Sequence, residues 1–150
     1  MKVITAPEPL KDVSQGIFLA GSIEQGRAVR WQDEVIFHLK DLDATILNPR
    51  RTNWDASWKQ DKDNKVFREQ VEWELAALEA SAWVLMYFDP KTKAPVSLLE
   101  FGLLVHTGKL LVCCPEGYWR KGNIDIVCEH YNIPQADDLL SLVALLKSKI

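Results

Sequence analysis

Short apolar stretches alternate along the chain with longer segments in which apolar residues recur every three or four positions. The short stretches have the length and the β-branched or aromatic content of buried strands, and the longer segments have the spacing of amphipathic helices. The predicted strands cover residues 17–20, 44–47, 83–88 and 110–114, with a short edge strand expected near 131–133. The predicted helices cover residues 27–42, 66–80, 97–107, 123–130 and 137–149.

This alternation predicts a single α/β domain over residues 1–150. Strands that are apolar throughout and separated by helices indicate a parallel sheet with helices on both faces, a three-layer α/β/α arrangement. Ligands of such folds bind beyond the carboxyl ends of the strands. The loops that follow the four main predicted strands are therefore the candidate site, and they cover residues 21–26, 48–64, 89–97 and 115–123.

The helix predicted at 66–80 carries a carboxylate beside an apolar stripe. Phe67, Val71, Leu75 and Leu78 form this stripe, and Glu74 lies close to it at 100° per residue. A carboxylate at the edge of an apolar face has a raised pKa unless it is paired, as a general acid requires. The alternative is that Glu74 extends to solvent or pairs with an arginine.

A second apolar stripe on this helix contains Trp73. An exposed Trp with small apolar neighbours is typical of a covered surface. We expect a partner subunit to cover it, in a homodimer or larger homo-oligomer. The alternative cover is another segment of the same chain.

Glu100 has apolar neighbours and lies near the start of a predicted helix. Ser97 and Glu100 have the S-x-x-E spacing of a capping box, in which the glutamate serves only to satisfy the helix end. A carboxylate near a helix N-terminus in a closed pocket is also suited to act as a nucleophile. The spacing does not separate these two interpretations.

The loops after the first two predicted strands contain groups suited to bind a small polar ligand. Gly21 permits close backbone approach, and the amides after it can hold an anion or a hydroxyl, although an ordinary turn is equally consistent. Arg50 and Arg51 are suited to a phosphate or carboxylate, or to pairing with nearby acids. Trp54 and Trp58 are suited to stack on a base, or to anchor the loop.

Composition narrows the function classes. Of the residues, 47% are hydrophobic and 26% charged, which excludes a mainly disordered chain, and the net charge of -3 does not favour binding to nucleic acid or an anionic membrane. The apolar run 82–88 is too short to span a bilayer. Three cysteines in apolar surroundings favour reduced thiols and a cytoplasmic location, and the scattered histidines give no metal-ligand spacing.

Five segments together resemble the nucleoside 2-deoxyribosyltransferase-like family. They are residues 17–23 (IFLAGSI), 48–51 (NPRR), 70–74 (QVEWE), 97–102 (SLLEFG) and 119–123 (WRKGN). The resemblance implies a flavodoxin-like, or Rossmann-like, fold with four or five parallel strands. It also implies cleavage or transfer at the N-glycosidic bond of a nucleoside or nucleoside monophosphate, without a metal or organic cofactor.

The resemblance assigns roles to two carboxylates. Glu100 matches the position of the glutamate that attacks the anomeric carbon and forms a glycosyl-enzyme. Glu74 matches the position of the acid near the leaving base, with Glu72 as the alternative. The physical logic is that of retaining glycosidases.

Eight further residues are the expected substrate-binding set. They are Gly21, Ser22, Arg50, Arg51, Trp54, Ser97, Arg120 and Asn123. Because the arginines suit a 5'-phosphate, hydrolysis of a nucleoside 5'-monophosphate is an alternative activity. A nucleotide-binding module without catalysis is a second alternative.

Overall fold

The core of the structure is a parallel sheet of six strands, seen in a computed structural model that describes all 150 residues. The strand order across the sheet is β1-β3-β2-β4-β5-β6, and every neighbouring pair is parallel. This confirms the predicted parallel α/β fold, with more strands than the four or five expected. The strands are β1 (Lys2–Thr5), β2 (Gly16–Gly21), β3 (Thr45–Asn48), β4 (Trp83–Tyr87), β5 (Leu110–Cys113) and β6 (Gln135–Ala136).

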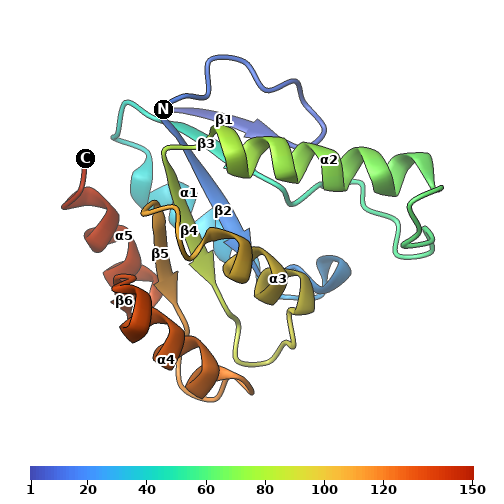
Figure 1. Cartoon of the computed structure of the whole chain (residues 1–150). Helices are drawn as coiled ribbons and strands as arrows, with labels where there is room; N and C mark the ends of the chain where they lie inside the picture. Colours follow the sequence, from blue (N-terminus) through green and yellow to red (C-terminus); the bar gives the residue numbers. More distant parts are fainter.

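Helices cover both faces of the sheet, so the molecule has three layers. Helices α2, α3 and α4 lie on one face, and α1 and α5 lie on the other (Figure 1). None of the α-helices has the length and apolar character that crossing a membrane requires. The helices are the short 3-10 helix η1 (Glu24–Gly26), α1 (Trp31–Leu39), α2 (Lys65–Ala80), α3 (Pro95–Leu104), α4 (Lys121–Tyr131) and α5 (Leu139–Lys147).

The central strands are buried on both faces, as their uninterrupted apolar sequences predict. Successive side chains of β2 alternate between the two cores: Phe18 packs with α2, α3 and α4, whereas Leu19 packs with α1 and α5. The same alternation divides Val84 and Leu85 of β4. The two cores therefore hold the carboxyl ends of β2 and β4 in a fixed position.

The topology places a ligand site at one end of the sheet. Strands β2 to β6 have the doubly wound flavodoxin order, to which β1 is added at the edge beside β3. The order reverses at β2, because β3 lies on one side of it and β4 on the other. The crevice at this reversal, beyond the carboxyl ends of the strands, is where such folds bind ligands.

Both edge strands differ from the prediction. β1 was not predicted, because only one of its four residues is buried and the segment shows no apolar pattern. The strand expected near 131–133 lies instead at Gln135–Ala136, because α4 continues to Tyr131 and Asn132 ends it in a left-handed conformation. Edge strands bury few side chains, so hydrophobic patterning locates them poorly.

The prediction for the apolar face of α2 was wrong. The face toward the core contains Trp73, Ala77 and Leu78, whereas Leu75 is exposed. Trp73 is buried by its own chain: its indole donates a hydrogen bond of 2.7 Å to the carbonyl of Glu8, and its ring lies 6.4 Å from that of Phe18. A partner subunit is therefore not what covers Trp73.

Candidate functional site

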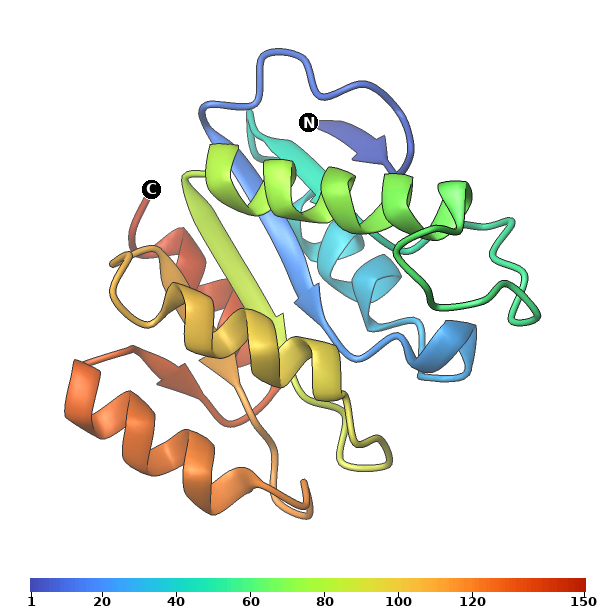
Figure 2. The same cartoon turned by 45° about the vertical axis from the view of Figure 1, so that its right-hand side comes forward.

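A cavity of about 310 Å³ opens at the carboxyl ends of β2 and β3. Its walls are η1, the loop that follows β3, the inner side of α2 and the first turns of α3. Figure 2 shows these segments gathered around the end of β2. The volume suits a small-molecule ligand, and the position is the one that the strand order predicts.

Glu74 extends from α2 into this cavity. Its Oε1 accepts a hydrogen bond of 2.7 Å from Nε2 of Gln70, one turn earlier on the helix. The same Nε2 donates to the carbonyl of Pro49 at 2.9 Å, which fixes the amide. Desolvation raises the pKa of Glu74 to about 7, and the Gln70 hydrogen bond opposes this rise. Glu74 is therefore able to hold a proton near neutral pH.

Glu100 faces the same cavity from α3 and is only 8% exposed. Burial and, to a smaller extent, the charge of Glu74 raise its pKa to about 8. Glu74 and Glu100 therefore line one cavity from different helices, and the negative charge of Glu74 acts on Glu100 there. Both carboxylates therefore resist ionisation near neutral pH, mainly because they are removed from water.

The capping-box interpretation of Ser97 and Glu100 is wrong. Helix α3 begins at Pro95 with Ala94 as its N-cap, so Ser97 lies inside the first turn and Glu100 in the second. The amide of Ala94 donates instead to the Glu24 carboxylate, at 2.7 Å. Ser97 is buried and lines the cavity one turn before Glu100. Both side chains are therefore available to a ligand.

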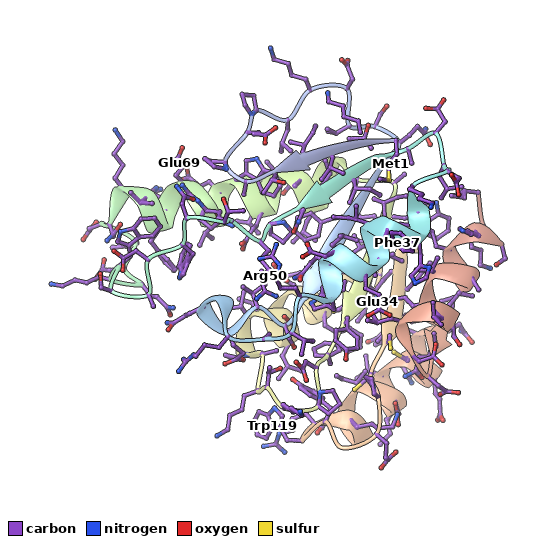
Figure 3. The ribbon with its side chains drawn as sticks, turned by 180° about the vertical axis from the view of Figure 1, so that it is seen from behind. Met1, Glu34, Phe37, Arg50, Glu69 and Trp119 are labelled. Atoms are coloured by element: carbon purple, nitrogen blue, oxygen red, sulfur yellow. The ribbon has the colours of Figure 1, made fainter.

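Arg50 lines the cavity, but its guanidinium is bound to the chain itself. Its NH1 and NH2 groups donate to the carbonyls of Gly26, Ala28 and Val29 at 2.6–2.9 Å, and NH1 also reaches Oε1 of Gln32 at 3.2 Å. Arg50 lies against the segment between η1 and α1 (Figure 3). The carbonyls of residues 26, 28 and 29 accept hydrogen bonds from the guanidinium, so they are not aligned for hydrogen bonds within a helix. For this reason α1 begins at Trp31 and not near residue 27 as predicted. Arg50 thus orders a wall of the cavity.

Arg51 and Trp54 carry polar atoms that lack partners. Both residues line the cavity, and NH1 of Arg51 and Nε1 of Trp54 are buried without a hydrogen bond. The Arg51 guanidinium lies 5.6 Å from the ring of Trp58, which packs edge-on against Trp54. A buried donor without a partner is costly, so these two atoms favour a polar ligand beside an aromatic wall.

Gly21 and Ser22 shape the end of β2. A Cβ at Gly21 would lie 2.1 Å from the carbonyl oxygen of Tyr87, and its φ of +139° is one that glycine favours. Ser22 is fully buried, and its Oγ accepts the Asp89 amide at 2.9 Å and pairs with Thr92 at 2.7 Å. Gly21 lines the cavity. Ser22 does not, and its hydroxyl instead holds the loop that follows β4, through Asp89 and Thr92.

Arg120 and Asn123 do not reach the cavity. Arg120 is exposed and stacks on Trp119 at 4.4 Å, and Asn123 is exposed on the first turn of α4. Trp119 itself lies far from Arg50 (Figure 3). The structure thus brings together Gly21, Arg50, Arg51, Trp54, Glu74, Ser97 and Glu100, and leaves Ser22, Arg120 and Asn123 outside.

Sequence reasoning missed five polar residues that line the cavity, which are Glu24, Gln25, Arg27, Gln60 and Gln70. Glu24 lies in the loop after β2 that was predicted to form part of the site, so its position could have marked it as a candidate. Its contact with Ala94 could not be predicted, because the two residues are 70 positions apart in the chain. Gln70 precedes Glu74 by four positions, the spacing at which helical side chains meet.

A flavodoxin-type sheet with two carboxylates in its switch-point cavity defines a class of protein that binds a small ligand beyond the carboxyl ends of its strands. The family model described as nucleoside 2-deoxyribosyltransferase like matches residues 14–118, and the chain belongs to this family. A comparison with curated proteins found no match. The family indicates the general kind of activity, chemistry on nucleosides.

Proposed function

We propose that the protein cleaves or transfers the N-glycosidic bond of a nucleoside, with Glu100 as the nucleophile and Glu74 as the acid. The observation that carries the proposal is that these two carboxylates line one cavity at the carboxyl ends of the strands. Both groups have raised pKa values, about 7 for Glu74 and about 8 for Glu100, and the proposed roles require that the proton lies on Glu74 and the negative charge on Glu100 when the sugar is bound. The reaction needs one ionised and one protonated carboxylate.

In the first step, an oxygen of Glu100 attacks the anomeric carbon of the sugar and the bond to the base nitrogen breaks. Glu74 donates its proton to the departing base, so the base leaves neutral. The products are the free base and a glycosyl ester on Glu100. Gln70 supports Glu74 in this role, because its hydrogen bond of 2.7 Å stabilises the carboxylate after the proton has left.

In the second step, a second base or water attacks the same carbon, and Glu74 accepts the proton of the attacking group. The ester bond breaks and Glu100 is released as a carboxylate. Two displacements at one carbon retain its configuration. Trp54 provides a face for the base, while Ser97 and the backbone at Gly21 contact the sugar. These roles need no metal or organic cofactor.

Three free, buried cysteines support a reducing, cytoplasmic setting as part of the same proposal.

The test is base release from a panel of nucleosides, each with and without a second free base as acceptor, followed by chromatography. We expect release or exchange by the native protein and a loss of at least about a hundred-fold in kcat for Glu100→Gln and Glu74→Gln. Release without an acceptor identifies a hydrolase, and release only with an acceptor identifies a transferase.

The matched control is Glu69→Gln, because Glu69 is an exposed glutamate on the outer side of α2 (Figure 3). This variant should keep its full rate. Native-like thermal unfolding of Glu100→Gln would show that its lost activity is chemical. If the panel is bound but no base is released by native protein, the chain is a nucleoside-binding module and the proposed chemistry is wrong.

A further inference from the structure

We propose that Glu24 is a positioning residue, which fixes the start of α3 and thereby the place of Glu100 in the cavity. The inference rests on the proposed function, because it gives Glu24 a part in presenting the nucleophile. It comes from a hydrogen bond that joins η1 to the N-cap of α3, and from the way in which the rest of α3 is held.

Glu24 gives α3 a contact that a helix normally takes from its own first turn. Oε1 of Glu24 accepts a hydrogen bond of 2.7 Å from the amide of Ala94, the N-cap residue. In a capping box, this amide bonds to a glutamate or glutamine three residues later in the chain. Ser97 occupies that position here, and the glutamate comes from 70 residues away. The start of α3 is therefore fixed by a distant segment of the chain.

Helix α3 packs on the core mainly beyond Glu100. Its buried apolar side chains, Phe101 and Leu104, both follow Glu100. Before Glu100, Val96 is exposed and Leu98 is only half-buried. Glu100 lies about 9 Å along the helix axis from the N-cap, at 1.5 Å per residue. Because a helix is stiff over this length, a shift at the N-cap displaces Glu100 in the cavity.

The segment that carries Glu24 is itself held in place. The NH2 group of Arg50 donates to the carbonyls of Gly26 and Ala28 at 2.9 and 2.7 Å. The amides of Gly26 and Ala28 donate to the carbonyl of Ile23 at 2.9 and 3.1 Å. Glu24 therefore extends from an ordered turn, and its carboxylate is a fixed acceptor for the start of α3.

The backbone is strained on both sides of this contact. Glu24, Gln25 and Ala94 have positive φ angles of 48°, 55° and 44°, although none of them is glycine. Such conformations cost free energy, and they cluster at functional sites where the surrounding structure holds them. A serine or aspartate N-cap in the usual extended conformation would fix the helix start without this cost. The strained contact therefore serves the placement of Glu100 and not stability alone.

Two substitutions at Glu24 separate its hydrogen bond from its charge. Glu24→Gln keeps an acceptor at the same reach and loses the charge, whereas Glu24→Asp keeps the charge but is one methylene shorter and does not reach the Ala94 amide. Aspartate tolerates the positive φ of this position, so the variant should fold. We expect kcat for base release to fall at least about ten-fold in Glu24→Asp and to stay within about three-fold in Glu24→Gln. KM should stay within about three-fold in both, because the ground-state contacts of the substrate are kept.

A second measurement reports on the position of Glu100 without turnover. Carbon-13 NMR of the glutamate carboxyl groups, with Glu100→Gln to identify the signal, follows the titration of Glu100. Burial is the main cause of its raised pKa of about 8, and the charge of Glu74 on α2 contributes less. A displaced helix start admits water and lowers this pKa. We therefore expect a lower pKa of Glu100 in Glu24→Asp and a native one in Glu24→Gln.

The control is Glu34→Asp, the same shortening at an exposed position on α1 (Figure 3). It should leave kcat and the pKa of Glu100 unchanged. Glu24→Gln impaired with Glu24→Asp near native would show that the charge matters and the reach does not, which overturns the proposal. Equal losses in the two variants, or no loss in either, overturn it as well.

The two measurements distinguish a failure of this proposal from a failure of the proposed function. If native protein releases no base but the pKa of Glu100 falls only in Glu24→Asp, the positioning role of Glu24 stands and the catalytic proposal is wrong. If native protein releases base and the two Glu24 variants behave alike, the catalytic proposal stands and the positioning role is wrong.

Discussion

At the residue scale, the two cavity carboxylates, Glu74 and Glu100, make stability depend on pH. Folding raises the pKa of Glu74 to about 7 and that of Glu100 to about 8, so the folded state binds protons more tightly than the unfolded state between pH 4.5 and these values. The stabilisation of the folded state by these bound protons is fully present below pH 4.5 and is lost as the pH rises through 7 and 8. Ionisation of Glu74 and Glu100 in the cavity therefore lowers the free energy of unfolding.

We expect Glu100→Gln to unfold at higher urea concentration than the native protein at pH 8.5, and the gain to vanish near pH 4.5. The neutral amide avoids the cost of ionising a buried group, which is on the order of a few kcal/mol. Urea midpoints at the two pH values measure the effect, with Glu69→Gln as the exposed control. A gain of equal size at both pH values would contradict the raised pKa.

At the scale of the elements, Arg50 decides the shape of one cavity wall. Arg50→Met keeps the length of the buried side chain but removes every donor to the segment between η1 and α1. We expect a loss of about 3 kcal/mol in the free energy of unfolding, because buried carbonyls lose a charged partner. Arg30→Met breaks an exposed pair with Asp33 and should cost less than about 1 kcal/mol. Denaturant unfolding measures both, and equal losses would refute the role of Arg50.

The cavity wall that Arg50 orders shows which parts of the site the sequence predicts and which it does not. Hydrophobic patterning predicted the central strands and the helices between them, because these segments bury apolar side chains, although it marked the wrong face of α2. It did not predict the role of Arg50, because a guanidinium suited to phosphate is equally suited to carbonyls 21 to 24 residues away in the chain. Nor did it show that Glu24, and not Ser97, meets the end of α3. Contacts between distant segments decide what a polar side chain binds.

At the scale of the whole molecule, α3 is the helix that lacks a solvent-facing polar side. Its polar residues, Ser97 and Glu100, are buried, whereas Val96, Leu99 and Leu103 on its outer side are 58%, 65% and 59% exposed. An α-helix that is apolar all round is normally buried. Since Trp73 is covered by its own chain, the predicted self-association is expected instead through this outer side of α3.

We expect the protein to be a dimer by light scattering after gel filtration, with α3 packed against α3 of a second copy. Leu99→Glu places a charge at the centre of this surface and should give a monomer. Ile126→Glu, at a residue 68% exposed on α4, introduces the same charge and should leave the dimer intact. Because Val96 belongs both to this surface and to the cavity wall, dissociation should also weaken nucleoside binding. A monomeric native protein, or a dimer that survives Leu99→Glu, would place the exposed face of α3 outside any contact between copies.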